Sequence, residues 1–169
     1  GASRERFHAL LTARELSHGG DDDGDDGGGG SGGSSDRIAV TEESHDQSLL
    51  TATRALLVLH PSSYTAWNSR KDVLQRSLQR SSSSSSKVTT TEMWKTLTTE
   101  IQFVDLVFTL HPKISEAWEH RSWCVREMLR LRSDAESGAD RSVMHRHELD
   151  VCEAVAVRYP KNYYAWSHR

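Results

Sequence analysis

An eleven-residue pattern that occurs three times constrains the fold of this chain more than any other feature of its sequence. Its copies read HPSSYTAWNSR from His60, HPKISEAWEHR from His111 and YPKNYYAWSHR from Tyr159. In every copy alanine follows proline by five residues, tryptophan by six and arginine by nine. The shared residues are Pro61, Ala66, Trp67, Arg70; Pro112, Ala117, Trp118, Arg121; and Pro160, Ala165, Trp166, Arg169. Recurrence at a nearly constant period is the signature of a repeat architecture.

Four positions upstream of each proline predict a helix that leads into the turn. The i, i+3, i+4, i+7 spacing of these positions places them on one helical face, which we expect to be buried. They hold Ala52, Ala55, Leu56, Leu59 in the first copy, Phe103, Leu106, Val107, Leu110 in the second, and Val151, Ala154, Val155, Arg158 in the third. Proline disfavours helix at the residue before it and has no N–H to donate. Each copy is therefore predicted to be helix, turn and helix.

A single hairpin with an apolar stripe on each helix cannot bury both stripes, so it must stack on neighbouring hairpins. We therefore predict an all-α fold, an α-α solenoid of antiparallel helical hairpins. The predicted repeats are 46–80, 91–132 and 143–169. The third of them is truncated, and we expect further repeats to follow in a longer parent chain.

The tryptophan and the arginine of the pattern have different expected roles. Trp67, Trp118 and Trp166 are expected to fill the gap between one hairpin and the next. The planar donors of the arginine have two possible targets, loop carbonyls of adjacent repeats or a carboxylate on a partner protein. We expect the first role for at least two of the three arginines.

Outside the repeats the chain has an N-terminal stretch and two low-complexity tracts, and the shortage of apolar residues lies in these two tracts. Residues 1–18 are predicted to form a short amphipathic helix, and the acidic, Gly/Ser-rich residues 19–45 a disordered insertion. A calcium loop is the alternative for the five aspartates between Asp21 and Asp26, but the alternating ligands and closing glutamate of an EF-hand are missing. The serine tract 81–86 predicts a flexible loop. We expect 19–35 and 81–86 to be mobile and dispensable for folding.

Charge and composition narrow the class of function. The formal net charge of -3 and the lack of a basic stripe argue against nucleic-acid binding. No apolar run reaches the length of a membrane span, and no signal segment is present, so a cytoplasmic location is the default. Cys124 and Cys152 lack the spacing of a zinc site and are predicted to be small buried hydrophobes. For the histidines, packing at turns and interfaces is favoured over metal binding.

The Pro-x-x-x-x-Ala-Trp-x-x-Arg pattern, preceded by an apolar helix, resembles the repeat of protein prenyltransferase alpha subunits. The resemblance covers roughly residues 46–169. Within that family, NSRK after Trp67, EHRSW around Arg121 and the run VCEAVAVRYPKNYYAWSHR are most similar to the alpha-type subunits of the third geranylgeranyltransferase.

This resemblance implies a crescent of hairpins around a separate beta subunit of the Rab geranylgeranyltransferase type. That partner is expected to hold the zinc, the isoprenoid diphosphate at the subunit interface and most of the site for a protein substrate with an acceptor cysteine. The present chain is then expected to bind no cofactor and to be inactive alone. The alternative is a helical-repeat scaffold for protein–protein interaction with no role in prenyl transfer.

One segment of the third copy, KNYYAW from Lys161, resembles the place where alpha subunits of farnesyltransferase and the first geranylgeranyltransferase hold a lysine near the isoprenoid diphosphate. The resemblance implies that Lys161 is a catalytic residue and that Tyr163 and Tyr164 line the same cleft. A lysine there would stabilise the charge that builds on the leaving diphosphate. The alternative is a solvated loop lysine, since alpha subunits that resemble the Rab enzyme's do without it.

Overall fold

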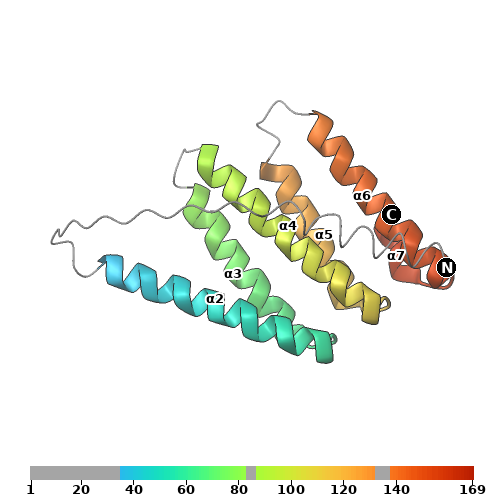
Figure 1. Cartoon of the computed structure of the whole chain (residues 1–169), viewed down its shortest axis with the longest axis horizontal. Coiled ribbons are helices and arrows are strands. Elements are labelled where there is room, and N and C mark those ends of the chain that lie inside the picture. The colour runs from blue at the N-terminus through green and yellow to red at the C-terminus, as the bar shows by residue number, and fades with distance from the viewer. Residues whose placement is uncertain (1–34, 83–86, 132–137) are drawn as a thin grey trace, which may run out of the picture.

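The structure, a computed structural model, describes residues 35–82, 87–131 and 138–169. The helices are α2 (Ser35–Leu59), α3 (Tyr64–Ser82), α4 (Lys87–Leu110), α5 (Ser115–Leu131), α6 (Gly138–Arg158) and α7 (Tyr163–His168). These described ranges contain no β-strand, which confirms the all-α prediction. Helices α2 and α3, α4 and α5, and α6 and α7 form three successive hairpins that lie side by side (Figure 1).

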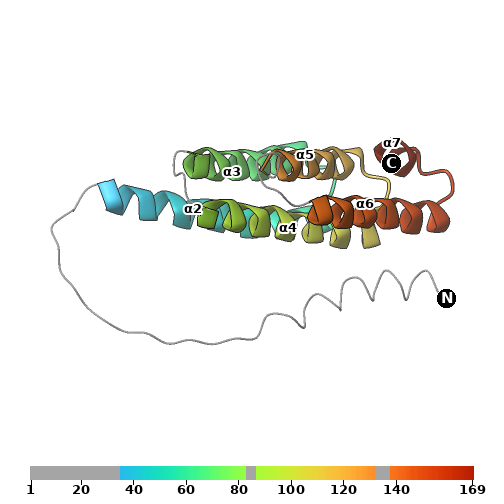
Figure 2. The ribbon, with the colours of Figure 1, turned by 90° about the horizontal axis from the view of Figure 1, so that it is seen from above.

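The hairpins stack into two layers. Figure 2 shows the leading helices α2, α4 and α6 in one layer and the return helices α3, α5 and α7 in the other. Contacts run within each hairpin and also between hairpins, from α3 to α4 and α5 and from α5 to α7. This arrangement confirms the predicted solenoid, in which each repeat packs only on its neighbours.

The fixed distance between proline and tryptophan follows from the geometry of the turn. In each copy the indole Nε1–H of the tryptophan donates to the carbonyl of the proline six residues earlier. The Nε1 to O distances are 2.8 Å for Trp67 and Pro61, 2.9 Å for Trp118 and Pro112, and 3.4 Å for Trp166 and Pro160. The bond satisfies a carbonyl that the turn leaves without a helical partner.

The predicted apolar stripe is wrong for the first copy and half right for the second. In α4, Phe103 and Val107 are buried, but Leu106 and Leu110 are exposed. Phe103 packs against Trp67 of the preceding hairpin, with ring centroids 5.9 Å apart. Within the described residues no hairpin precedes α2, so all four stripe residues of the first copy are exposed: Ala52, Ala55, Leu56 and Leu59. Burial on a leading helix therefore depends on its neighbours in the stack.

The leading helices begin earlier than the sequence indicated. Helix α2 begins at Ser35, where residues up to 45 were predicted to be an insertion, because the segment from 36 to 45 contains no glycine or proline to stop a helix. Helix α3 likewise continues through Ser82, into the predicted serine loop. The predicted N-terminal helix 1–18, residues 19–34 and residues 83–86 lie outside the described residues.

None of the helices in the described part of the chain is both long and apolar enough to cross a membrane.

Candidate functional site

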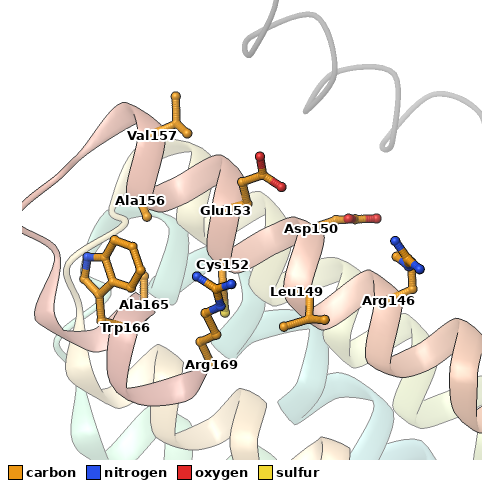
Figure 3. A pocket seen from close by; sticks show the side chains of 10 residues that line it. All are labelled: Arg146, Leu149, Asp150, Cys152, Glu153, Ala156, Val157, Ala165, Trp166 and Arg169. Atoms are coloured by element: carbon orange, nitrogen blue, oxygen red, sulfur yellow. The ribbon is translucent and has the colours of Figure 1, made fainter.

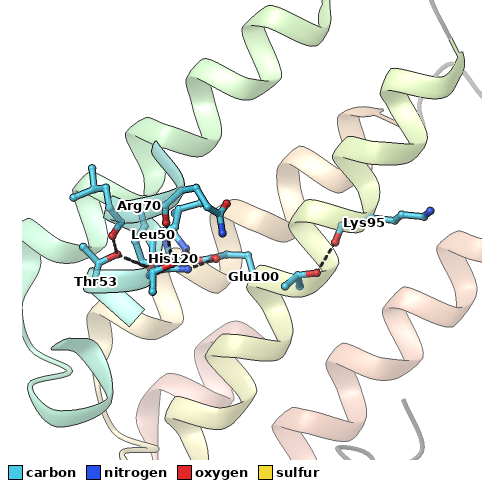
Figure 4. Close-up of polar contacts among 10 residues, drawn as sticks. Leu50, Thr53, Arg70, Lys95, Glu100 and His120 are labelled. Carbon is cyan, nitrogen blue, oxygen red and sulfur yellow. Dashed lines mark hydrogen bonds and ion pairs between the residues drawn. The ribbon is translucent and has the colours of Figure 1, made fainter. Parts of the chain in front are cut away.

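The arginine of the first copy lies in a buried polar cluster between the first two hairpins. Arg70 on α3 is 3% exposed. Its Nε and Nη2 donate to the two carboxylate oxygens of Glu100 on α4, at 2.7 and 2.6 Å. His120 Nε2 on α5 lies 2.8 Å from Glu100 Oε1 (Figure 4). We call Arg70, Glu100 and His120 the first cluster.

The first cluster also reaches back into its own hairpin. The Nη1 of Arg70 donates to the backbone carbonyl of Leu50 at 2.6 Å and to Thr53 Oγ1 at 3.0 Å, both on α2 (Figure 4). The three nitrogens of the Arg70 guanidinium thus donate to residues of two other helices, α2 and α4. Because arginine offers its donors in a rigid fork, this geometry fixes the angle at which the second hairpin meets the first.

The second cluster repeats this arrangement one hairpin later. Arg121 on α5 is fully buried, and its Nε and Nη2 donate to Glu148 Oε2 and Oε1 on α6 at 2.8 and 2.7 Å. Its Nη1 donates to Asp105 Oδ1 on α4 at 2.6 Å. His168 Nε2 at the end of α7 lies 2.8 Å from Glu148 Oε2. We call Arg121, Glu148 and His168 the second cluster.

The residues of both clusters stand at the same distances from the prolines of the repeat pattern. The glutamates, Glu100 and Glu148, each stand twelve residues before the proline of their own copy, and the histidines each stand eight residues after it. The arginine always comes from the preceding copy. The first copy holds Leu49 and Ser69 at the glutamate and histidine places, so it supplies an arginine but no acceptor. In both clusters, therefore, the arginine of one copy pairs with the glutamate of the copy that follows it.

The prediction that the arginines bind loop carbonyls is wrong. Arg70 contacts a single carbonyl, that of Leu50, which lies inside a helix of the same repeat. The main acceptors are carboxylates on the next hairpin. Sequence reasoning missed Glu100 and Glu148, although their constant distance from the proline in two copies was a signal that could have found them.

Burial and pairing shift the pKa values of the two glutamates in opposite directions. Burial alone would raise the pKa of Glu100, but the hydrogen bonds from Arg70 and His120 lower that pKa to about 2. For Glu148, burial is likewise outweighed by His168 and Arg121, and its pKa is also about 2. Both carboxylates are therefore ionised at neutral pH, and each is held by an arginine and a histidine. They are suited to holding hairpins together and unsuited to proton transfer.

Ser122 gives the second cluster a superficial similarity to a hydrolase triad. Its Oγ lies 2.8 Å from His168 Nδ1, and the other nitrogen of that ring contacts Glu148. However, Glu148 already accepts two bonds from Arg121. In the first cluster the same His–Glu contact occurs with Lys71 at the serine's place. The arrangement is part of the repeat interface, and we assign it no acyl-transfer chemistry.

The expected position of the tryptophans, between one hairpin and the next, is confirmed in two of the three copies. Trp67 and Trp118 are each 3% exposed, and each ring lies against the cluster histidine of the next hairpin. The centroid distances are 4.9 Å to His120 and 5.2 Å to His168. Trp166 is 53% exposed, because no described hairpin covers it.

The structure places the predicted catalytic residues on the outside of the last turn. Lys161 is exposed, and Tyr163, which is 74% exposed, packs edge-on against Tyr164. Asn162 between them is buried and caps α7 through its side-chain oxygen. Its Nδ2 also donates to the Pro112 carbonyl at 2.6 Å, which fixes the turn against the preceding hairpin. Lys161 and Tyr163 are thereby held on the solvent side, apart from both clusters.

The cysteines are buried and unpaired, as predicted. Burial raises the pKa of the Cys124 thiol well above its usual range and that of Cys152 to about 11, with the nearby glutamates acting in the same direction. Both thiols are therefore protonated and unreactive at neutral pH. In the ranges that the structure describes, no group of three or more His, Cys, Asp or Glu side chains is arranged to hold a metal ion.

Stacked hairpins, a proline–tryptophan turn and an arginine that joins each repeat to the next define an α-α repeat protein. Comparison with known families agrees with the internal alignment. The model of the protein prenyltransferase alpha subunit repeat matches residues 46–77, 97–128 and 145–169, more than half of the chain. The chain belongs to the protein prenyltransferase alpha subunit repeat family.

Individual relatives point to two groups within that family. The chain is 31% identical over 134 residues to protein prenyltransferase alpha subunit repeat-containing protein 1 of Danio rerio, covering 73% of this chain and 28% of that protein. The Homo sapiens protein of the same name is 32% identical over 133 residues, 72% and 29% of the two chains. The geranylgeranyl transferase type-2 subunit alpha of Candida albicans is 24% identical over 127 residues, 75% and 31%. The chain thus spans less than a third of the length of these relatives.

Proposed function

We propose that this chain is the repeat region of an alpha-type subunit of a heterodimeric protein prenyltransferase. The observation that carries the proposal is the family match over all three repeats, together with relatives named geranylgeranyl transferase type-2 subunit alpha. The repeated clusters support it, because buried charge pairs at every hairpin junction make a stiff frame on which a second protein can be held.

The proposed division of labour leaves the chemistry to the partner. A prenyltransferase zinc activates a substrate thiol, which requires ligands that converge on an open coordination position. In this chain the carboxylates of the two clusters are each paired with a buried arginine, and the two cysteine thiols are protonated and buried. We therefore assign the zinc, the isoprenoid diphosphate and the transfer of a geranylgeranyl group to a beta subunit of the Rab enzyme's type. The assembly is proposed to act in the cytoplasm on the acceptor cysteine of a protein substrate.

Co-expression with a Rab-type beta subunit tests the proposal. We expect the two chains to co-elute in size exclusion and the complex to transfer geranylgeranyl to a cysteine-containing substrate protein, while this chain alone transfers none. Stable association with the beta subunit but no transfer would limit the proposal to assembly. Association only with proteins unrelated to prenyltransferases would contradict it and favour the helical-repeat scaffold.

Lys161 is proposed to face the beta subunit's cavity and to stabilise the leaving diphosphate, with Tyr163 beside it. Its exposure in the free chain is what a residue of an intersubunit cleft requires. We expect Lys161→Ala to lower turnover at saturating isoprenoid by about 10-fold, which corresponds to about 1.4 kcal/mol of transition-state stabilisation, and to leave assembly with the beta subunit unchanged.

A matched control for this variant exists in the same chain. Lys113 occupies the same place in the second turn and is also exposed, but it lacks the Asn-Tyr that follows Lys161. Lys113→Ala should turn over like the unmodified complex. If Lys161→Ala also did so, Lys161 would be an ordinary surface residue.

A further inference from the structure

The two ends of the stack of hairpins differ in the chemistry of their outer faces. At the last hairpin, an open cavity of about 480 Å³ lies between α6 and the end of α7. Figure 3 shows charged side chains along its α6 side, namely Arg146, Asp150 and Glu153. A face with this many charged groups is compatible with water, because charged side chains are the usual surface residues of proteins.

The outer face of the first hairpin is apolar instead. Helix α2 stands at one end of the row of hairpins (Figure 1), and its exposed residues Ala52, Ala55, Leu56 and Leu59 form a stripe that we call the α2 stripe. Leu56 is 42% and Leu59 is 72% exposed. The neighbouring Arg54 lies over the Phe103 ring of α4, 5.2 Å from its centroid, and is thereby directed towards the next hairpin. Solenoids cover such apolar ends with a capping element that has a polar outer side.

The sequence before α2 contains a segment with the character of such a cap. Residues 3–17 carry Phe7, Leu10 and Leu11 at i, i+3 and i+4 spacing, which places these three side chains on one face of a helix. The polar residues Glu5, His8 and Thr12 share the opposite side of that helix. As a helix, the segment can therefore bury three large apolar side chains and still present polar groups to water.

The linker between this segment and α2 has the length that docking on the α2 stripe requires. If Phe7 lies beside Leu59 in an antiparallel arrangement, Ser17 lies beside Leu49. From there to the first residue of α2 the span along the helix is about 21 Å, at about 1.5 Å per residue. A Gly-rich linker as long as residues 18–34 has a root-mean-square end-to-end distance of about 21 to 25 Å. Effective concentration is highest when these two lengths match.

Charge at the end of α2 agrees with the antiparallel orientation. The free carbonyl groups at the C-terminal end of a helix carry a partial negative charge, which nearby cations stabilise. The last turn of α2 contains no basic residue. Antiparallel docking brings Arg4 and Arg6, which precede Phe7, to this end of α2. A parallel segment would place them at the opposite end.

Two other occupants of the α2 stripe fit less well. Helices that lie on a lipid surface carry Lys and Arg beside their apolar face, whereas the exposed residues Glu42 and Glu43 precede the α2 stripe. A second copy of the chain binds only at its bulk concentration, whereas a short flexible linker holds its segment at an effective concentration in the millimolar range. The tethered segment is therefore favoured.

We propose that residues 3–17 form a helix that packs antiparallel on the α2 stripe, so that the chain covers the first end of its own stack. In this arrangement Phe7 lies against Leu59 and Leu10 against Leu56. The inference goes beyond the proposed function, because it concerns the outer face of the first hairpin and holds whether or not the chain takes part in prenyl transfer.

A thiol placed in the α2 stripe measures whether the stripe is covered. Leu56→Cys introduces this thiol on the surface of α2, whereas Cys124 and Cys152 are buried. We expect it to react with a maleimide at least about 10-fold more slowly in the full chain than in the same chain with Phe7→Asp and Leu10→Asp, which abolish the apolar face of the segment. Equal rates in the two chains would overturn the proposal. Circular dichroism checks that both chains keep the helices of the stack.

Matched controls separate docking from a general effect of the added charges. His8→Asp and Thr12→Asp add the same charges to the polar side of the segment, and they should leave the thiol of Leu56→Cys slow to within about twofold. Acceleration equal to that caused by Phe7→Asp and Leu10→Asp would contradict the assigned face. Val157→Cys, at a position of α6 that is 58% exposed, should react at one rate in all chains. If slow labelling of Leu56→Cys disappears on dilution, the occupant is a second copy and the proposal is wrong.

Discussion

Replacing Arg121 with glutamine should lower the free energy of unfolding of this chain by about 3 to 5 kcal/mol, the usual cost of removing one partner from a buried ion pair. Arg121 is completely buried and donates to Glu148 and Asp105. Glutamine keeps a donor but removes the charge, so two buried carboxylates lose the cation that balances them. Since domains are commonly stable by only about 5 to 15 kcal/mol, the third hairpin should separate from the second. Urea unfolding followed by circular dichroism measures the loss.

The loss from Arg121→Gln should shrink in acid, and this distinguishes a charge effect from a packing effect. The folded pKa of Glu148 is about 2, below the ordinary value of 4.5. Its pairing therefore stabilises the fold fully above pH 4.5 and loses that contribution as the pH falls towards 2. The gap between the unmodified chain and the variant should close across this interval. A gap that stays constant from pH 7 to the acid limit would contradict the assignment.

Arg169 provides the matched control for this substitution. It holds the same place in the repeat pattern, but it is exposed and has no carboxylate partner within the described ranges. Arg169→Gln should change the free energy of unfolding of the present chain by no more than about 0.5 kcal/mol. Equal losses for the two variants would mean that motif position, and not the buried pairing, sets the cost.

Replacing Trp118 with alanine should cost about 3 to 5 kcal/mol, in the range measured for large aromatic residues removed from protein cores. Trp118 is 3% exposed, and its ring stacks on Phe108 at 4.1 Å between centroids. It also lies against His168 and donates to the Pro112 carbonyl. The substitution therefore opens a cavity between the second and third hairpins and leaves a turn carbonyl with one donor fewer. Thermal and urea unfolding measure the effect.

Trp166→Ala tests whether this cost comes from the stack or from the turn. Trp166 donates to its own proline carbonyl, as Trp118 does, but 53% of it is exposed. Without a hairpin over it, its removal should cost about 1 kcal/mol or less. If Trp166→Ala destabilised the chain as much as Trp118→Ala, the turn hydrogen bond would be the main contribution and the packing argument would fail.

The local architecture could be predicted from the sequence because its causes are local. Proline ends the leading helix within one or two residues, and the tryptophan six positions later reaches back to the proline's carbonyl. These interactions are complete within one copy of the pattern, so repetition of Pro61, Pro112 and Pro160 is enough to predict three helical hairpins. The need of each hairpin to bury its apolar face then requires stacking.

Which face of each helix is buried, and what the arginines bind, was decided only by the tertiary structure. Helical periodicity identifies residues that share a face, but it does not say which neighbours cover that face. Leu56 and Val107 occupy the same place in the pattern, yet within the part of the chain that the structure describes only Val107 has a preceding hairpin to pack against. Similarly, Arg70 and Glu100 are 30 residues apart in the sequence and Arg121 and Glu148 are 27 apart. Such contacts form only when separate hairpins meet, because each cluster is assembled from helices that no single repeat contains.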